Sequence, residues 1–526
     1  MPFKRCLLSL VILFIFVTVL FFHLCPGTRA GTRETDMISG KKDELSDMDE
    51  ERVSKTQHVL TLKDQKLSYS AVAGQLVVKR VAERKAVRGR IFYVYYAMEG
   101  DGQIDRPITF AFNGGPGAAS VWLHLGGVGP RRVLLADSGK TLPPPVQLEN
   151  NAYTWLRFTD LVFVDPVGTG FSKSDPDDQT SGKHFYGVQQ DIETLAEFIR
   201  LFLTRTNRWL SAKYLVGASY GTTRVSGLVW YLQQRFGIDV NGIVFVSPVL
   251  DYDTILFHPS NDLPYLLFVP TYTATAHYHG LLESTLRQKT LEDLLAEVES
   301  FCLTDYVVYL ARGESLSDDT KEELLQRIRR YTGLSGDLIE KLNYRINWID
   351  FTRGLIQSDN RFVGRMDSSI TGIDPAPTAP YPKYDPSLDP LFGPFSSAIN
   401  AYIREDLKFE ADHVYEFLNA EVNQQWDWAS GLIRKQGFID VSHTLRDAIA
   451  VNENLKVLIA CGLYDLATPY FSAKYTLSHM WLGKQRANVS IKYYKSGHMI
   501  YTHADELKRL FQDAKQFYMN ASNITK

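Results

Sequence analysis

A short apolar strand, a glycine-bounded serine and a helix follow one another in KYLVGASYGTTRVSGLVWYLQQRFG (residues 213–237). The strand pattern is Tyr214-Leu215-Val216, and the helical pattern that follows keeps its apolar side chains on one stripe until Gly237. A sharp strand-to-helix turn exposes its central residue at the carboxyl edge of a sheet, and glycines on each side allow the strained backbone. The pattern predicts Ser219 as a nucleophile, and a serine that only caps the helix is the alternative.

Apolar runs of the same kind occur on both sides of this turn, and turn residues bound each of them. They are ITFAFNGGPG (108–117), LVFVDPVGTG (161–170), GIVFVSPVL (242–250), KVLIACG (456–462) and VSIKYY (489–494). Short, continuously apolar strands indicate a sheet buried on both faces, and helical stretches between them favour parallel strands. The sequence therefore predicts an α/β fold with a mostly parallel sheet flanked by helices.

The strands divide the folded part of the chain into two pieces, residues 58–250 and 429–526. Between them, residues 251–428 show no clear core strand and carry charged helical patterns with a proline-rich loop. We predict that this segment is a helical insertion that forms a lid over one edge of the sheet. An independent domain is the alternative, but the strand pattern resumes at Lys456 and continues to the end of the chain.

The N-terminus has the layout of an export signal. Lys4 and Arg5 precede an uncharged apolar stretch at residues 7–24, and small residues follow before position 31. The apolar stretch is 18 residues long, which is just enough to span a membrane, so residues 1–30 are a cleaved signal or an anchor. Residues 31–57 are polar and are interpreted as a tether. We expect an exported protein, periplasmic or extracellular, that residues 7–24 anchor if they are retained.

Composition excludes several classes of function. The net charge is −3 and no long basic run is present, so no nucleic-acid partner is expected. Outside the export segment only Cys302 and Cys461 remain, and these either pair or are simply buried. They lack the spacing of a zinc site, and His277 and His279 have no third ligand motif nearby. We therefore expect no metal and no cofactor, while the sequence leaves the oligomeric state open.

A serine hydroxyl needs a base, and the base needs an orienting acid. In this type of site the chain order is serine, acid, histidine. His498 comes directly after the strand VSIKYY, and Asp465 follows the strand KVLIA in a glycine- and proline-containing loop. Asp251 competes as the acid because it follows the strand after the serine helix, but we prefer Asp465. His503 is close in sequence to the predicted base, but we expect it inside the final helix.

The transition state of acyl transfer also needs hydrogen-bond donors for its oxyanion. The first candidate is the N–H of Tyr220, the residue after the nucleophile. The second is the N–H of Gly115, in the glycine-rich stretch NGGPGAAS (113–120) that follows a predicted strand. A plain turn is the alternative for this stretch. Loss of one such donor typically costs about 3 kcal/mol of transition-state stabilisation.

Five motifs, in order, resemble the serine carboxypeptidase family (peptidase family S10), and its bacterial branch most of all. They are FNGGPGAASVWLHLGGVGP, NAYTWLRFTDLVFVDPVGTGFS, GASYGTTR, LYDLATPY and GHM. The resemblance runs from about residue 58 to the end. It implies an α/β-hydrolase fold with a helical insertion and the release of single residues from peptide C-termini. By motif match it implies Ser219 as nucleophile, His498 as base, Asp465 as orienting acid, Gly115 and Tyr220 as oxyanion donors, and Asn113 and Gly114 as contacts of the substrate's terminal carboxylate.

Two positions depart from the family pattern. The family's glutamate before the nucleophile is replaced by Ala218, and a second glutamate is replaced by Gly127. The resemblance implies that this acid pair binds the substrate carboxylate, so its loss predicts weaker recognition of a peptide C-terminus. Arg224 is either a substitute cation or, as we prefer, part of a structural ion pair.

Three functions are consistent with these residues. The first is an exported serine hydrolase that cleaves residues from peptide C-termini through an acyl-enzyme. The second is an esterase or acyltransferase on the same triad, with a small acyl substrate instead of a peptide. The third is a catalytically inactive binding protein, against which the intact serine, aspartate and histidine argue.

Overall fold

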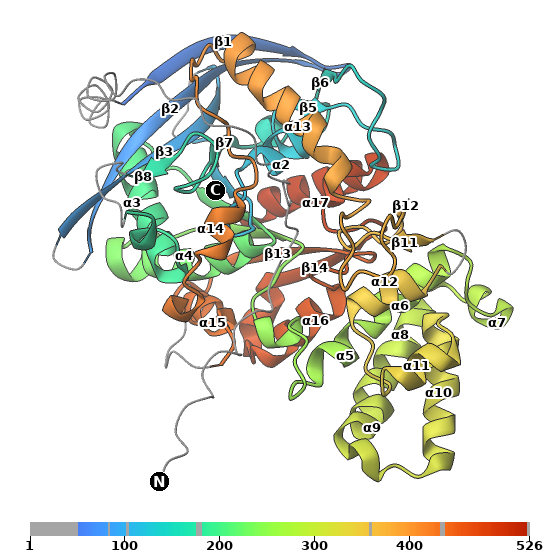
Figure 1. Cartoon of the computed structure of the whole chain (residues 1–526). Helices are drawn as coiled ribbons and strands as arrows, with labels where there is room; N and C mark the ends of the chain where they lie inside the picture. Colours follow the sequence, from blue (N-terminus) through green and yellow to red (C-terminus); the bar gives the residue numbers. More distant parts are fainter. Residues whose placement is uncertain are drawn as a thin grey trace, which may run out of the picture.

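The structure is a computed structural model that describes residues 51–82, 85–100, 105–174, 181–356, 360–431 and 437–522. A central twisted sheet crosses the molecule, and helices cover both of its faces (Figure 1). The predicted export segment lies outside the described residues. None of the helices described here combines the length and the hydrophobicity that a membrane span requires.

The central sheet has ten strands in the order β1-β2-β3-β7-β4-β9-β10-β13-β14, with β8 paired to β3. The strands are β1 (Val53–Thr61), β2 (Lys66–Ala82), β3 (Lys85–Met98), β4 (Ile108–Phe112), β7 (Asp160–Val164), β8 (Lys173–Ser174), β9 (Lys213–Ala218), β10 (Gly242–Val246), β13 (Lys456–Gly462) and β14 (Val489–Tyr494). All pairs from β7 to β14 are parallel, whereas β1, β2, β3 and β8 join by antiparallel pairing. The prediction of a mostly parallel sheet is confirmed for the part that the apolar runs form.

The N-terminal edge strand corrects one predicted boundary. β1 begins at Val53 and pairs with β2 along its whole length, so residues 53–57 belong to the sheet and not to the predicted tether. Their side chains alternate between exposed and partly buried, as expected of an edge strand with one solvent face. This alternation is too polar to stand out from a tether in the sequence.

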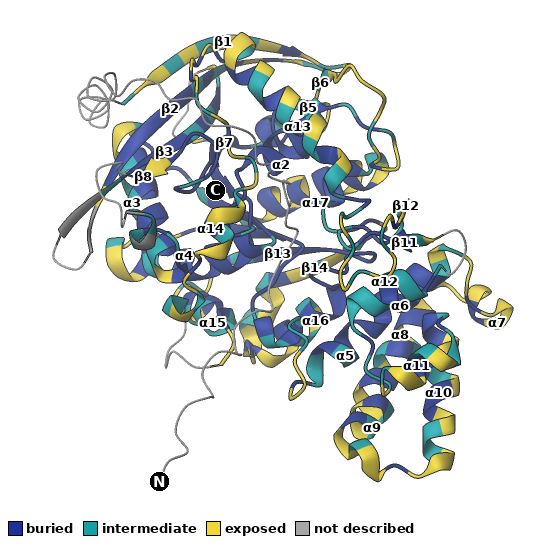
Figure 2. Cartoon of the chain, viewed as in Figure 1, coloured by how far each residue is buried: buried dark blue, intermediate teal, exposed yellow. Residues whose placement is uncertain are grey.

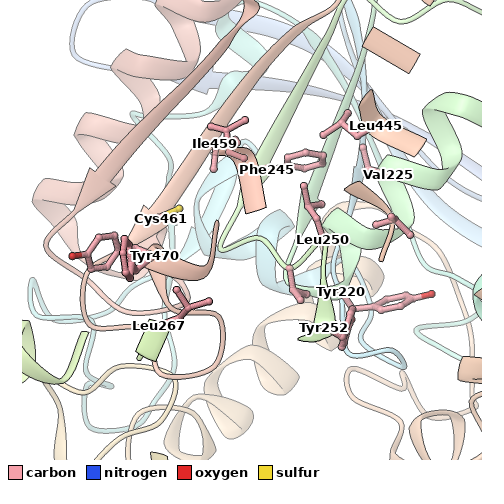
Figure 3. Packing of buried hydrophobic residues seen from close by; sticks show 14 of the residues in the cluster. Tyr220, Val225, Phe245, Leu250, Tyr252, Leu267, Leu445, Ile459, Cys461 and Tyr470 are labelled. Atoms are coloured by element: carbon pink, nitrogen blue, oxygen red, sulfur yellow. The ribbon is translucent and has the colours of Figure 1, made fainter. Parts of the chain in front are cut away.

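The apolar runs are continuous because both faces of the parallel strands are buried. Along β10, Ile243 and Phe245 join the core on one face, whereas Val244 and Val246 join the core on the other. Figure 2 shows the strands at the centre of the molecule as almost entirely buried. Figure 3 shows part of the first core, where Phe245 of the sheet lies in one cluster with side chains from the covering helices.

Helices from different parts of the chain cover the two faces. α3 (Val188–Arg205), α4 (Tyr220–Phe236) and α15 (Ser442–Val451) pack together on the first core, and α16 (Tyr470–His479) also contributes to it. The other face is covered by α2 (Val121–Leu123) and α17 (Ala504–Ser522). The predicted serine helix is therefore α4, which ends at Gly237 with φ 62°.

The segment between β10 and β13 is mainly helical. It contains α5 (Leu263–Leu267), α6 (Val269–Tyr278), α7 (Ser284–Arg287), α8 (Leu291–Phe301), α9 (Val307–Arg312), α10 (Asp318–Thr332), α11 (Gly336–Lys341), α12 (Trp348–Gly354), α13 (Asp389–Ala401), α14 (Ala420–Gln424) and a small hairpin, β11 (Arg361–Val363) with β12 (Thr371–Ile373). Figure 1 shows α7 to α12 gathered in one lobe, while α13 lies at the other end beside α2. The role of this insertion as a lid stays a prediction.

Candidate active site

Ser219 occupies a strained turn between β9 and α4. Its φ of 58° and ψ of −131° lie outside the regions that residues other than glycine commonly adopt. A Cβ on Gly217 would lie 2.3 Å from the Gly221 carbonyl oxygen, and one on Gly221 would lie 2.7 Å from the Phe112 oxygen. Because the backbones approach so closely at both places, only glycine fits at either position.

Asp465 and His498 meet at the carboxyl ends of neighbouring strands. Asp465 follows β13 and His498 follows β14, which pair in parallel, so both loops leave the sheet at the same edge. The His498 Nδ1 atom lies 2.8 Å from Asp465 Oδ2. The Asp465 side chain is fully buried and the His498 side chain is 10% exposed, and the hydrogen bond to Asp465 occupies the Nδ1 atom of the ring.

Three donors fix the Asp465 carboxylate. Its Oδ1 accepts the backbone N–H groups of Ala467 (2.8 Å) and Thr468 (2.9 Å), and its Oδ2 accepts the Thr468 hydroxyl at 2.8 Å. The competing acid, Asp251, instead accepts the N–H of Asp253 at the start of a short 3₁₀ turn. The structure thus brings the preferred acid, and not its competitor, to the imidazole.

The end of β10 connects the serine with the histidine. The N–H of Ser219 donates to the carbonyl of Val246 at 3.0 Å, and the hydroxyl of the next residue, Ser247, donates to the carbonyl of His498 at 2.7 Å. The Thr468 hydroxyl also lies 3.0 Å from the Ser247 carbonyl oxygen. The last residue of β10 and the residue that follows it therefore contact the backbones of Ser219 and His498 and the Thr468 side chain that binds Asp465.

The glycine-rich loop after β4 packs directly on the serine turn. A Cβ on Gly114 would lie 2.6 Å from the backbone nitrogen of Tyr220 and 2.8 Å from Ser219 Cβ. Gly115 follows with φ 98°, a conformation that favours glycine. Tyr220 is the first residue of α4, where the N–H has no partner inside the helix. The two predicted oxyanion donors therefore belong to segments in contact.

Arg224 forms the structural ion pair that the sequence suggested. Its Nε donates to Asp191 Oδ2 at 2.6 Å, and its Nη1 donates to the carbonyl of Asn113. The Arg224 side chain is 1% exposed, and its guanidinium lies 5.1 Å from the centre of the Tyr220 ring. It therefore links the serine helix to the glycine-rich loop and is not available as a substitute cation for a substrate.

The predicted carboxylate subsite carries few free polar groups. Asn113 is 5% exposed, and its Oδ1 accepts the N–H of Leu123 at 2.9 Å. A Cβ on Gly127 would lie 2.7 Å from both Tyr501 Cβ and Leu507 Cδ1, so these two side chains fill the space where the family's second glutamate would begin. With Ala218 also apolar, the residues that replace the acid pair offer no carboxyl group.

A buried carboxyl supports the segment after the glycine-rich loop. Asp165, which is 1% exposed, accepts the N–H and the hydroxyl of Ser120, both at 2.7 Å, and the hydroxyl of Tyr415 at 2.9 Å. Burial raises the pKa of Asp165 to about 6, although these hydrogen bonds oppose the rise. The carboxyl therefore binds its proton more tightly in the folded chain than in the unfolded one.

This tighter binding predicts a pH-dependent stability difference for Asp165→Asn. The contribution of Asp165 to stability is complete below its unfolded pKa and is lost as the pH rises through about 6. The asparagine does not titrate, so the variant should gain about 3 kcal/mol relative to the wild type between about pH 4 and about pH 7. Urea unfolding of both proteins across this range measures the difference, and a flat difference would contradict the prediction.

Two other histidines that the sequence analysis named form structural contacts, and the two cysteines do not pair. His279 Nε2 lies 2.8 Å from the Ser368 carbonyl oxygen, and His503 Nε2 lies 2.6 Å from Asp367 Oδ2. His503 precedes α17, so its predicted place inside the final helix is wrong by one residue, because the helix begins at Ala504. Cys302 and Cys461 are both free and buried. Among the described residues, no group of three His, Cys, Asp or Glu side chains could hold a metal ion.

Sequence reasoning missed several residues of this site. Ser247 and Thr468 position the triad through the contacts above, and Asp165 positions the glycine-rich loop. Thr468 follows the acid by three residues, a spacing typical of side chains that hydrogen-bond a nearby carboxylate, so that signal was available. Asp165 lies directly after an apolar strand and could have been recognised as a buried carboxyl in need of donors.

Together, the parallel sheet, the strained serine turn and the aspartate–histidine pair at its carboxyl edge define an α/β hydrolase. The chain belongs to the serine carboxypeptidase family, peptidase family S10, because the family model matches residues 64–512.

The individual relatives share a low sequence identity with this chain. The pheromone-processing carboxypeptidase KEX1 of Yarrowia lipolytica is 24% identical over 388 residues, which cover 72% of this chain and 53% of the relative. The lysosomal protective protein of Mus musculus is 27% identical over 205 residues, 38% of each chain. The match thus spans about half the length of the first relative and less of the second. The crystal structure of the prohormone-processing carboxypeptidase Kex1 of Saccharomyces cerevisiae has the same fold, with a TM-score of 0.52 and 16% identity over 89% of this chain and 91% of that chain.

Proposed function

We propose that this protein is an exported serine hydrolase of the carboxypeptidase type, with Ser219, Asp465 and His498 as its triad. The observation that carries the proposal is the 2.8 Å hydrogen bond between Asp465 and His498 at the sheet edge where the strained Ser219 turn also lies. Export rests on the sequence of residues 1–30 alone. Its substrates are peptides, and neither nucleic acid nor a cofactor takes part.

In the proposed mechanism the His498 Nε2 atom accepts the proton of Ser219 as the serine oxygen attacks the substrate carbonyl. Asp465 holds the imidazole in the tautomer that carries its proton on Nδ1. The N–H groups of Gly115 and Tyr220 stabilise the oxyanion, and His498 then gives its proton to the leaving amine. Water, activated by the same imidazole, hydrolyses the acyl-enzyme and regenerates the serine.

The altered carboxylate subsite supports a weaker preference for free C-termini. A hydrogen bond to a charged group contributes about 1.5–3 kcal/mol, which is about a 10- to 150-fold effect on affinity. Because Ala218 and Gly127 supply no such bond, we expect the free acid of a blocked dipeptide to exceed its C-terminal amide in kcat/KM by a measurable factor that stays below about tenfold.

Hydrolysis rates of the two dipeptides, measured side by side with release of the C-terminal residue, test both parts of the proposal. A preference of more than about a hundredfold would mean that another group binds the carboxylate and would contradict the argument from the missing acid pair. Equal rates on acid and amide would favour the second candidate, an esterase or acyltransferase on the same triad, which the apolar Ala218 and the filled space at Gly127 also support.

A further inference from the structure

A segment of the insertion contacts both of the loops that carry the proposed acid and base. Residues 364–370 connect β11 with β12. The carbonyl of Arg365 accepts the N–H of Leu466 at 3.0 Å, next to the proposed acid, and the N–H and hydroxyl of Ser368 both donate to the Tyr464 carbonyl at 2.9 Å. The insertion is therefore bonded to the acid loop on both sides of Asp465.

The same segment holds the backbone of the proposed base. The N–H of His498 donates to the carbonyl of Met366 at 2.6 Å, and the N–H of Gly497 donates to Asp367 Oδ2 at 3.1 Å. A Cβ on Gly497 would lie 2.2 Å from the Met366 oxygen and 2.5 Å from Asp367 Cα. The two backbones are thus in direct contact, and the placement of His498 depends on where residues 366 and 367 lie.

Hydrogen bonds on both carboxylate oxygens hold the Asp367 side chain in place at this contact. It is 7% exposed, and its carboxylate accepts four hydrogen bonds. Oδ2 accepts from Gly497 and from His503 Nε2 (2.6 Å), while Oδ1 accepts the N–H and the hydroxyl of Ser369 at 2.9 and 2.5 Å. Its own N–H donates to the hydroxyl of Ser387 at 2.9 Å. With both oxygens engaged, the carboxylate has one orientation.

We propose that Asp367 is a positioning residue for the His498 base, an inference that rests on the proposed function. Asp367 does not face the Asp465–His498 hydrogen bond; it holds the peptide that precedes the imidazole and ties it to α17 through His503. A displacement of a catalytic group by about 1 Å costs about a hundredfold in rate. The insertion is consequently part of the catalytic geometry as well as the predicted cover of the sheet edge.

The test is the labelling of the full chain by a serine-directed phosphonate, which requires an activated serine but no peptide specificity. For Asp367→Ala we expect the maximal labelling rate to fall about 10- to 100-fold, as for other residues that orient a catalytic ligand. The phosphonate concentration at half-maximal rate should stay within about threefold, because the binding surface is unchanged. A rate within about threefold of the wild type would overturn the proposal.

Asp367→Asn is the second variant for the same labelling test, and it replaces Asp367→Ala if the alanine variant does not fold. An amide nitrogen cannot accept a hydrogen bond, so the asparagine cannot satisfy all four donors, and either the Gly497 side or the Ser369 side loses its acceptor. We expect a smaller fall, about 3- to 10-fold, again with the half-maximal concentration unchanged. A wild-type rate in the folded asparagine variant would equally overturn the proposal.

Asp374→Ala is the matched control. Asp374 is a buried carboxylate of the same insertion, paired with Arg353 at 2.8 Å, and its other oxygen accepts the N–H of Ala376, so both of its partners belong to the insertion itself. Its loss should leave the labelling rate near that of the wild type, whereas an equal fall in both variants would mean general loosening and would refute the positioning role. If the wild type itself is not labelled, the proposed function fails and this inference fails with it; labelled wild type with unaffected Asp367→Ala refutes the inference alone.

Discussion

Replacing Ser219 with alanine is expected to lower kcat on a blocked dipeptide by about a million-fold, with little change in KM. The alanine removes the atom that forms the acyl-enzyme in the proposed mechanism, and the Ser219 side chain makes no capping hydrogen bond to α4. The backbone of Ser219 is held by the Val246 carbonyl and by the N–H of Thr222, and both bonds remain in the variant. Substrate binding should therefore survive while the chemistry is lost.

Phosphonate labelling and dipeptide hydrolysis, measured together, check this expectation. The wild type should be labelled at one site, and the label should disappear in Ser219→Ala. Ser226→Ala is the matched control, because Ser226 lies seven residues further along the same helix, about two turns away, with its hydroxyl bonded to the Thr222 carbonyl. Labelling that persists in Ser219→Ala would place the nucleophile elsewhere, and a folded wild type without any labelling would favour the inactive binding protein.

The parts of this site that the sequence predicts are those that local chemistry dictates. A strained turn between a buried strand and a helix requires glycines where backbones touch, so GASYG indicates both the turn and the proposed nucleophile. The acid and the base each follow a continuously apolar strand, because parallel strands deliver their next residues to one edge. Sequence order and strand pattern predict that the acid and the base lie at one sheet edge, and the glycine- and proline-containing loop after the acid strand favours Asp465 over Asp251.

Residues that act through long-range contacts give no such signal. Asp367 approaches His498 from 131 positions earlier in the chain, inside an insertion whose helical patterns do not indicate which loop returns to the sheet. The sequence shows that Arg224 places a positive charge on a helix. It does not show that Asp191 neutralises this charge or that Arg224 Nη1 donates to the Asn113 carbonyl, because both contacts depend on tertiary packing. The edge strand β1 was hidden for a related reason, since its polar alternation matters only once β2 is beside it.

Asp465→Asn is expected to lower kcat by about ten-thousand-fold while leaving the fold intact. Oδ1 of Asp465 accepts two backbone N–H groups, from Ala467 and Thr468, so the amide oxygen of an asparagine must take that position. Its NH₂ group then faces His498 Nδ1, which has to accept a hydrogen bond and give up its proton. The imidazole proton moves to Nε2, and the base can no longer accept the proton of Ser219.

The pair Asp465→Asn and Asp251→Asn separates the two acids that the sequence offered. Asp251 caps a short turn and does not contact His498, so its amide variant should retain kcat within about threefold of the wild type. Phosphonate labelling should follow the same order, because the tautomer governs activation of the serine irrespective of the substrate. A large loss of kcat in Asp251→Asn with a small loss in Asp465→Asn would make Asp251 the orienting acid. It would also contradict the inference that the residue bonded to His498 Nδ1 determines which imidazole nitrogen carries the proton.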